Sequence, residues 1–592
     1  MKTTLLLLPL LALVVFPMWA DKPFFYDKTG EKIIYSVRKD KVLLKYNSTN
    51  DARSLQSNVV AKELTLLPEN RMIADVDTTQ AQLRAIRETP GISDAGYMLQ
   101  YREGDGQLIY PTEKLFICHK EGESIDRILE IAGLSEKVLS IERFTEYSPL
   151  YIVQLDEPIE NMMDIGNRTY ETGLCEFAVP SFMRIPEFLE PIVSQNMAQS
   201  TTIVANTTDY YPMQWGLKNT AQFQIDRMIA GCDIDVEPAW EITKGNSSIK
   251  IAVVDNGVQL DHPELVDNLL QGYNGISDYM GQGAGAPYDK DDTAHGTNCA
   301  GVIAAVDNGV GVIGVAPNCK IIPIKAYSEF VGYDATYANG LRYAWKTGKA
   351  DVVCCSWFIA PNALNPAVEL AIDCLVVHGR NGKGSVVVCA AGNNAEYQVL
   401  FPASHPATIA VGAISPCGER KTPTSCCVGS GGFGVSAYGE GLDVVAPGIN
   451  IYTTGLGGNI ETNFMDTSAA CPFVAGIAAL VLSVDPSLTY EEVRTIIRST
   501  AVDPITQQPY SVLSEEFGYG LAKAGAAVSL AASQLTYIVD RTVTADTVVS
   551  NRCVFVQNAT VTNNAKLTID AQQYVEINGP FEVELGSELE LR

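Results

Sequence analysis

The sequence predicts an α/β fold in which a parallel β-sheet is covered by helices on both faces, and two observations support this prediction. Between residues 209 and 532, apolar runs such as IKIAVVD, DVVCCSW and GSVVVCAAG alternate with helical patterns such as PAVELAIDCLVVHG and YEEVRTIIRST. Strands that are apolar along their whole length indicate burial on both faces, which a parallel sheet between two helical layers provides. We therefore place the largest domain at residues 209–532.

The regions on either side of this domain have different patterns. Residues 21–114 contain short alternating runs that predict a β-rich region. Residues 115–193 follow the order strand, helix, strand, strand, helix, strand, which is an α+β (βαββαβ) unit. A Thr- and Asn-rich linker, residues 194–208, is predicted to be exposed and open to proteolysis. Residues 535–592 are rich in Val, Thr and Asn in short alternations, which predicts a small all-β module, with the cap of a β-solenoid as one form.

Residues 1–20 have the pattern of a signal peptide. Lys2 gives a positive start, an apolar run extends from Leu5 to Phe16, and Ala20 offers a small residue at the cleavage point. The run is shorter than the roughly 20 apolar residues that a membrane-spanning helix needs, and no later stretch of the sequence qualifies. We therefore expect a protein that is secreted, or held at the cell surface or in the periplasm, without a membrane span.

The chain of 592 residues is strongly acidic. Its 69 acidic and 42 basic residues give a formal net charge of −27. Such a charge disfavours polyanionic partners, so we expect no nucleic acid among its ligands.

Fourteen cysteines in an exported chain permit disulfide bonds, although the sequence does not give their connectivity. Cys417 could close a short loop with either Cys426 or Cys427. Cys354 and Cys389 lie inside apolar runs, where a free cysteine behaves as a small buried apolar residue, so we expect few disulfides. The sequence has no pair of CxxC or HxxxH spacing, which argues against a zinc site.

Four residues of the α/β region have the side chains that peptide hydrolysis by a serine requires: a nucleophile, a base, a carboxylate that orients the base, and an oxyanion donor. Asp255 ends the apolar strand IKIAVVD, and His295 begins the small-residue helix of TAHGTNCAGVIAA. Ser468 opens the apolar helix of MDTSAACPFVAGIAALVL, and Asn393 ends the strand VVVCAAGN. Each residue alone has a structural explanation, as a strand-end carboxylate, a helix cap or a turn residue.

Taken together, the order Asp, His, Ser with the motifs HGT and TSAxxP resembles the subtilisin-like serine peptidases (subtilases), notably secreted bacterial members with a long N-terminal region. The resemblance covers about residues 209–532 and includes GVIGVAPNCKIIPIKA, FPASHPATIAVGAI and FGYGLAKAGAAV. It implies a subtilisin-like fold and a secreted serine endopeptidase that forms an acyl-enzyme intermediate.

The resemblance also implies the roles of the four residues, in an arrangement for which subtilisin is itself a reference case. Ser468 would be the nucleophile and His295 the general base and acid. Asp255 would orient His295. Asn393 and the backbone N–H of Ser468 would form the oxyanion hole.

Further resemblance implies a set of substrate-binding residues: Ser356, Trp357, Phe358, Ala391 and Gly392. Phe358 replaces a usual Gly, which predicts a pocket for small or medium apolar side chains. The segment SWFIAPNALNPA has no acidic residue, so a basic side chain would lack a partner there.

Two alternatives compete with a working peptidase. Asp466 stands where the family has Gly before Thr-Ser, and together with Phe358 it motivates a catalytically impaired binding or scaffold protein on the same fold. An exported esterase or lipase would instead show a GxSxG nucleophile motif with Ser before His, and Ser468 lies in DTSAA after His295.

The resemblance implies a structural calcium ion, and no organic cofactor is expected. The oxygen ligands would come from side chains and from backbone carbonyls, a donor type that suits calcium; they are the side chains of Asp209, Glu264 and Asn308 and the carbonyls of Val306, Val310 and Val312. The 115–193 unit is expected to act as an intramolecular inhibitor and folding chaperone, so that the protein is made as a zymogen and acts on protein or peptide substrates.

Overall fold

The computed structural model describes residues 24–26, 32–46, 63–67, 71–75, 86, 92–100, 108–185, 208–223, 227–287, 294–328, 331–359, 365–394, 397–428, 434–510, 512–533, 535–539 and 541–591. The chain divides into two compact units, Met1–Phe182 and Met183–Arg592. The predicted signal peptide and nearly all of the predicted linker lie outside the described residues.

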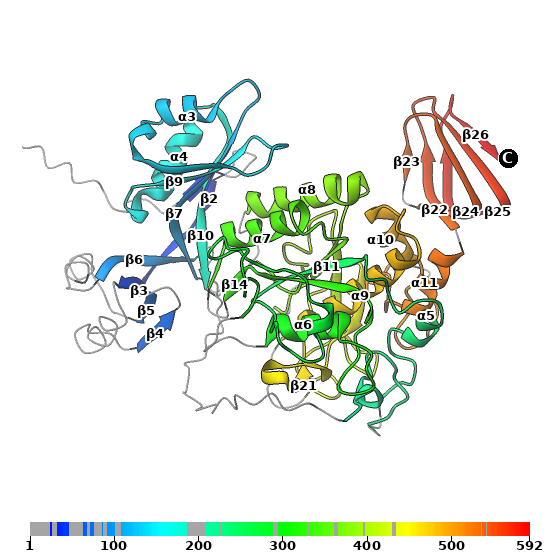
Figure 1. Cartoon of the computed structure of the whole chain (residues 1–592). Helices are drawn as coiled ribbons and strands as arrows, with labels where there is room; N and C mark the ends of the chain where they lie inside the picture. The colour runs from blue at the N-terminus through cyan, green and yellow to red at the C-terminus, as the bar shows by residue number, and fades with distance from the viewer. Residues whose placement is uncertain are drawn as a thin grey trace, which may run out of the picture. The chain divides into compact units, whose positions relative to one another are not determined.

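The first unit is built on a β-sheet with two helices on it (Figure 1). Its strands, in spatial order, are β10 (Cys175–Ile185), β7 (Leu108–His119), β6 (Ile92–Gln100), β3 (Ser36–Tyr46), β5 (Arg71–Asp75) and β4 (Glu63–Leu67). β9 (Leu150–Leu155) pairs with both β7 and β8 (Val138–Arg143). Helices α3 (Ile125–Ile131) and α4 (Met162–Glu171) share a buried apolar cluster with β7 and β9, which includes Leu115, Ile128, Val153 and Ile165.

β7 crosses the boundary that we predicted between residues 114 and 115. Its first half pairs with β6 through Ile109 and Leu99, and its second half pairs with β9 from Lys114 to Cys118. Because one continuous strand hydrogen-bonds to both regions, the β-rich region and the βαββαβ segment share a sheet.

The second unit contains a seven-stranded sheet in which every pair of neighbours is parallel (Figure 1). The spatial order is β12 (Tyr273–Asn274), β13 (Lys320–Lys325), β11 (Lys250–Asp255), β16 (Val352–Cys355), β17 (Val386–Ala390), β18 (Ile409–Ile414) and β19 (Val444–Pro447). β11, β16, β17, β18 and β19 are buried along almost their whole length.

Helices cover both faces of this sheet, as predicted. Ile251 and Val253 of β11 pack in the same core as α6 (His295–Ala304) and α9 (Thr467–Val484). On the other face, α7 (Asp334–Lys346) contacts β11 and β13 and packs on α8 (Pro366–Gly382). Gly340 lets α7 pack closely on the sheet, because a Cβ at this position would lie only 3.2 Å from Val254 and 3.1 Å from Ile324.

α9 is the central helix of the second unit. Every residue from Thr467 to Leu482 is buried. Among the described residues it is the one helix long and apolar enough to cross a membrane, but 83% of it is buried inside the protein, as in the core helix of a globular domain. Two smaller helices, α10 (Tyr490–Ser499) and α11 (Ala524–Ala532), contact it, and α5 (Val236–Ile242) packs on α11.

The described C-terminal region is a sheet of parallel strands: β22 (Leu535–Val539), β23 (Thr542–Val543), β24 (Thr547–Val561), β25 (Lys566–Val583) and β26 (Glu588–Leu591). Leu535 lies opposite Cys553, and Lys566 lies opposite Glu588. Parallel pairing of strands so close in sequence requires the chain to return to the same end of the sheet between them, which favours a solenoid-like arrangement over hairpins.

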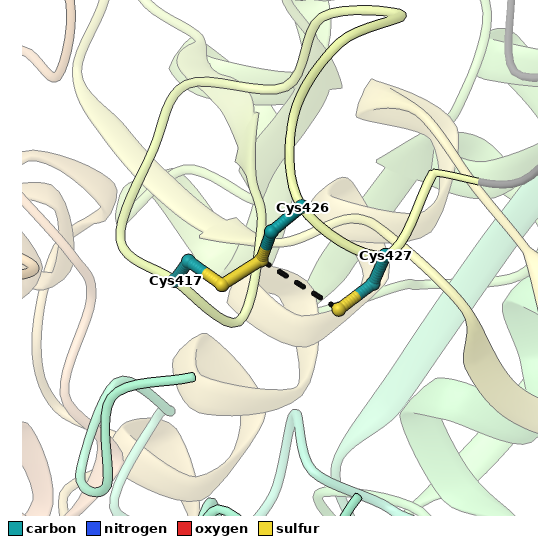
Figure 2. A group of neighbouring side chains, drawn as sticks. All are labelled: Cys417, Cys426 and Cys427. Atoms are coloured by element: carbon teal, nitrogen blue, oxygen red, sulfur yellow. Dashed lines mark hydrogen bonds between the residues drawn. A yellow bond between two sulfur atoms is a disulfide. The ribbon is translucent and has the colours of Figure 1, made fainter. Parts of the chain in front are cut away.

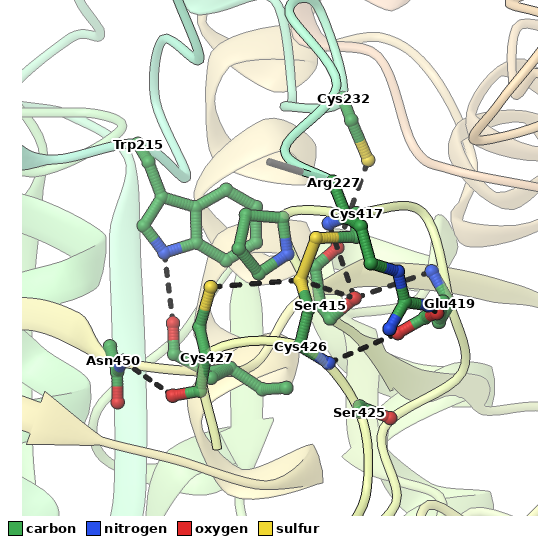
Figure 3. The surroundings of a disulfide bond; sticks show 12 residues. Trp215, Arg227, Cys232, Ser415, Cys417, Glu419, Ser425, Cys426, Cys427 and Asn450 are labelled. Atoms are coloured by element: carbon green, nitrogen blue, oxygen red, sulfur yellow. Dashed lines mark hydrogen bonds and ion pairs between the residues drawn. A yellow bond between two sulfur atoms is a disulfide. The ribbon is translucent and has the colours of Figure 1, made fainter. Parts of the chain in front are cut away.

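One short loop is closed by a disulfide bond between Cys417 and Cys426 (Figure 2). Of the two partners that the sequence allowed for Cys417, the structure therefore has Cys426, while Cys427 keeps a free thiol 3.6 Å from Cys426 Sγ. Figure 3 shows the ion pair of Arg227 with Glu419 beside this loop. Cys354 and Cys389 are free and buried, as predicted.

Candidate active site

Asp255 is the last residue of β11, where the parallel strands of the sheet end. Only 1% of its surface is exposed. Its Oδ1 atom accepts hydrogen bonds from His295 Nδ1, from the Tyr327 hydroxyl and from the backbone N–H of Asn256, each at 2.8 Å. Three donors therefore satisfy this buried carboxylate oxygen.

His295 is the first residue of α6, and its ring is fixed between a carboxylate and an aromatic ring. Phe464 packs edge-on against it, with the ring centroids 5.6 Å apart. The next residue, Gly296, donates its backbone N–H to Asn256 Oδ1 at 2.9 Å. A Cβ at Gly296 would lie 2.3 Å from the carbonyl oxygen of Gly257, so only glycine allows this approach.

The environment of His295 shifts its titration in a direction that suits a base. Burial by itself disfavours the charged imidazole, but the neighbouring charge of Asp255 and its hydrogen bond outweigh burial and raise the pKa of His295. A quarter of the side chain remains exposed, so a reactant could reach the ring.

Ser468 is the second residue of α9 and is 8% exposed. Its hydroxyl donates to the carbonyl oxygen of Ser356 at 3.0 Å rather than to His295. Cys299 Sγ of α6 lies 3.8 Å from both Ser468 O and Asp255 Oδ2. This contact brings the start of α9 next to the Asp255–His295 pair.

Asn393 lies beyond the end of β17 and accepts hydrogen bonds from Thr467, the residue before Ser468. Its Oδ1 atom accepts hydrogen bonds from Thr467 N at 3.1 Å and from Thr467 Oγ1 at 2.7 Å. Since both bonds require an acceptor, the network assigns this atom as oxygen, and the amide nitrogen points away from Thr467. The side chain is therefore oriented to donate.

The predicted substrate-binding residues follow two neighbouring strands. Ser356, Ala391 and Gly392 are buried, and Phe358 is half-buried. The indole N–H of Trp357 donates to Val254 O at 2.8 Å, so this side chain belongs to the wall behind Asp255. The structure brings all five residues to the end of the sheet that carries Asp255 and Asn393, because they follow β16 and β17.

Sequence reasoning missed Tyr327. The hydroxyl of this half-buried residue is 2.8 Å from Asp255 Oδ1 and 3.4 Å from His295 Nδ1. Part of a signal was present, because Tyr327 follows the apolar strand IIPIK by two residues, but the pairing of β13 with β11 is known only from the structure. Carboxyl ends of adjacent parallel strands lie at the same edge.

A second cluster contains the residues predicted to bind calcium. Asn308 Nδ2 donates to Glu264 Oε2 at 3.3 Å, and Val310 N donates to Asn308 Oδ1 at 3.0 Å. Val306 N donates to Glu264 O at 2.9 Å. A cavity of about 280 Å³ is lined by five of the six predicted residues, Asp209, Val306, Asn308, Val310 and Val312, and by Lys244, but not by Glu264.

The donors of this cluster fit a hard cation. Glu264 is 3% exposed, and burial raises the pKa of its carboxyl to about 7. Within the described part of the chain no Lys, Arg or His forms an ion pair with it. Its one side-chain donor is the neutral Asn308 amide, so among the described residues this buried carboxylate lacks a compensating charge, which a bound Ca²⁺ would supply.

Comparison with known proteins decides the family. The model of the subtilase family (Peptidase_S8) matches residues 246–520, a segment that contains Asp255, His295, Asn393 and Ser468. A thermophilic serine proteinase of Bacillus sp. (strain AK1) is 33% identical over 352 residues, which cover 58% of this chain and 72% of that protein. The chain belongs to the subtilase family. This subtilase is therefore a serine protease, that is, a hydrolase.

Other relatives of this subtilase extend over more of its length. A calcium-dependent protease of Trichormus variabilis (strain ATCC 29413 / PCC 7937) is 29% identical over 550 residues, which cover 84% of this chain and 77% of the relative. A second calcium-dependent protease, from Nostoc sp. (strain PCC 7120 / SAG 25.82 / UTEX 2576), is 30% identical over 486 residues, with coverage of 75% and 67%.

Among solved structures, fervidolysin from Fervidobacterium pennivorans, described as a keratinolytic enzyme related to subtilisin, has the same fold. The TM-score is 0.51 at 21% identity. The match covers 74% of this chain and 64% of that chain. At this identity the likeness concerns the fold alone, and it supports the subtilisin-like architecture described above.

Proposed function

We propose that the protein is a secreted endopeptidase that cleaves peptide bonds through an Asp255–His295–Ser468 triad. The observation that carries the proposal is the 2.8 Å hydrogen bond between His295 Nδ1 and Asp255 Oδ1, because it fixes the tautomer in which Nε2 is the proton acceptor. The same bond holds the ring plane and stabilises the imidazolium that forms during the reaction.

In the first step, Ser468 Oγ attacks the carbonyl carbon of the scissile bond and its proton passes to His295 Nε2. The hydroxyl must first leave the carbonyl oxygen of Ser356, which a rotation about the Cα–Cβ bond allows. The developing oxyanion accepts hydrogen bonds from the Asn393 side-chain amide and from Ser468 N. The N-terminal end of α9 adds the favourable field of its helix dipole.

In the second step, the C–N bond breaks and His295 gives its proton to the leaving amine. The acyl group stays on Ser468 as an ester. Water then attacks that ester, again with His295 as the base, and the acid product and free serine form.

Removal of the base tests this sequence of steps. His295→Ala is expected to abolish cleavage of a peptide substrate while the protein remains folded. His119→Ala, a change in the first unit, is the matched control and should leave the rate unchanged. Turnover by the His295→Ala protein at the control's rate would contradict the triad.

We further propose that Ca²⁺ is bound by the side chains of Asp209, Glu264 and Asn308 with the carbonyl oxygens of Val306, Val310 and Val312. The ion would supply a positive charge that ties the 306–312 loop to Glu264. In this proposal the ion stabilises the structure and takes part in no catalytic step.

The N-terminal region is proposed to inhibit the enzyme until it is removed. Support comes from the last residues of β10, because Met183 and Arg184 pair antiparallel with Tyr333 and Gly332 of β15 (Val331–Tyr333). Arg184 Nε donates to Asp334 Oδ1 at 2.5 Å and Nη2 donates to Oδ2 at 3.0 Å, and both side chains are buried. The edge strand β15 thus accepts an added strand, which is the way in which many proteins bind an extended peptide.

The cleavage that removes this region is expected between residues 194 and 209, after export has removed residues 1–20. N-terminal sequencing of the active secreted protein tests both steps. A fully active protein that starts at Asp21 would reject removal as the activating step.

The pocket that receives the side chain before the scissile bond is proposed to favour small or medium apolar groups, since Phe358 narrows it. A dominant preference for Arg or Lys in peptide-library cleavage would contradict this assignment.

A further inference from the structure

Asp466 has a backbone conformation that side-chain-bearing residues rarely adopt. Its φ is 74° and its ψ is −171°. Among the twenty amino acids, this region of backbone space is accessible without strain essentially to glycine alone. A residue that is held there must be fixed by the groups around it.

A buried lysine is one of these groups. Lys421 is fully buried and forms an ion pair with Asp466 Oδ1. Its Nζ atom also donates to the carbonyl oxygen of Gly434. Gly434 itself lies against the Asp466 carboxylate, because a Cβ on that glycine would come within 2.7 Å of Oδ1.

The backbone of both partners is tied to the sheet. Lys421 N donates to Ala413 O of β18 at 2.8 Å, and Asp466 N donates to Gly448 O at 2.9 Å. The ion pair therefore joins two segments that are each anchored at the carboxyl end of the sheet, Lys421 beside β18 and Asp466 beside the end of β19.

The backbone of Asp466 also fixes the first turn of α9. Its carbonyl oxygen accepts hydrogen bonds from Ala469 N at 3.0 Å and from Ala470 N at 3.3 Å. Thr467, the residue that follows Asp466, donates two hydrogen bonds to the Asn393 side chain. A movement of Asp466 would thus move Ser468 and both oxyanion donors together.

We propose that Lys421 and Asp466 form a positioning pair, in which the buried ammonium neutralises Asp466 and keeps it in its left-handed conformation, so that Ser468 N and the Asn393 amide stay aligned. The proposal rests on the function proposed above and assigns the pair no contact with substrate.

The pair also acts on His295 through its charge. The titratable groups that face His295 are Asp255 from β11, Asp466 before α9, Tyr327 from β14 (Tyr327–Ser328) and Cys299 from α6. The negative charge of Asp466 favours the protonated imidazole. In the proposed pair, the positive charge of Lys421 would offset part of that effect.

Three variants test the pair: Lys421→Met, Asp466→Gly and the double variant. Lys421→Met leaves the Asp466 charge without its partner, so kcat should fall about tenfold to a hundredfold with little change in KM. The acid limb of the kcat/KM profile should move to higher pH. Asp466→Gly leaves a buried ammonium unpaired, so this protein should melt at a lower temperature than the wild type.

The double variant carries the decisive result. Glycine accepts the φ of 74° without strain and methionine fills the lysine's space without a charge, so kcat should return to within about threefold of the wild type. The acid limb should lie below that of Lys421→Met. Lys218→Met, which removes an exposed ion pair with Glu237, is the matched control and should change nothing.

A Lys421→Met protein with wild-type kcat and pH profile would overturn the proposal, and so would a double variant no more active than Lys421→Met. If Lys421→Met does not fold, Asp466→Gly and the double variant can still be compared with each other. Equal melting temperatures and equal kcat in these two proteins would overturn the proposed pair. Failure of the proposed function is a separate outcome, because the wild type itself would then lack activity.

Discussion

Two carboxylates of the second unit, Asp255 and Glu264, are almost equally buried but are stabilised in different ways. Asp255 is 1% exposed and receives three hydrogen bonds at 2.8 Å on one oxygen. Glu264 is 3% exposed and receives one side-chain hydrogen bond, from Asn308 at 3.3 Å, and burial raises its pKa to about 7.

The difference in hydrogen bonding indicates how the charge of each carboxylate would be stabilised. A carboxylate whose charge is met by protein donors can orient a histidine without any added ion. Glu264 has one side-chain donor, and in the calcium site proposed above a bound cation would stabilise its charge. The following changes test this contrast, from the largest expected effect to the smallest.

The largest effect is expected for Asp255→Asn. The amide keeps the shape of the side chain but removes the charge and favours the wrong tautomer of His295. kcat should fall by about 10⁴-fold, the size known for the same change in another Ser-His-Asp protease. Steady-state kinetics on a peptide substrate measures it, and Glu264→Gln at saturating calcium should keep a rate near that of the wild type.

Removal of calcium should affect stability rather than chemistry. At a free calcium concentration of about a hundred times Kd, binding would stabilise the folded state by about 2.7 kcal/mol, and a chelator would remove this contribution. Thermal melting with and without chelator measures the shift. Glu264→Gln should abolish the difference between the two melts, whereas Asp255→Asn should keep it. A chelator effect that survives in the Glu264→Gln protein would place the calcium site elsewhere.

A smaller change is expected for Tyr327→Phe. The hydroxyl shares Asp255 Oδ1 with His295, so its removal leaves more of the carboxylate charge to the imidazole. The pKa of His295 is already raised by Asp255, and it should rise further. The neutral base then forms at higher pH, so the acid limb of kcat/KM should move upward. An unchanged limb, or one that moves downward, would show that Tyr327 only packs against the site.

The sequence predicted those parts of the molecule that depend on local pattern. Apolar runs such as IKIAVVD are buried strands, and the residue after the last apolar position, Asp255, lies at the sheet edge where a parallel sheet presents its ligands. His295 and Ser468 begin helices because small or apolar residues follow them. These features are encoded within a few residues of each other.

What the sequence did not predict depends on contacts between distant segments. Tyr327 and Asp255 are 72 residues apart in the sequence but form a hydrogen bond, and no periodicity near either residue predicts this contact. Asp466 was identified as a departure from the family, but its partner Lys421 lies in a loop whose pattern is uninformative. The choice of Cys426 over Cys427 for Cys417 was also set by loop geometry, which spacing alone does not give.

The central claim is that Ser468 is a nucleophile activated by His295, and labelling with a fluorophosphonate tests it most directly. The wild-type protein, after removal of its N-terminal region, should be labelled at one residue, identified as Ser468 by mass spectrometry of the peptide that contains it. Ser468→Ala should not be labelled, and His295→Ala should be labelled far more slowly. Absence of label on the folded wild type, or equal labelling of Ser468→Ala, would contradict the account.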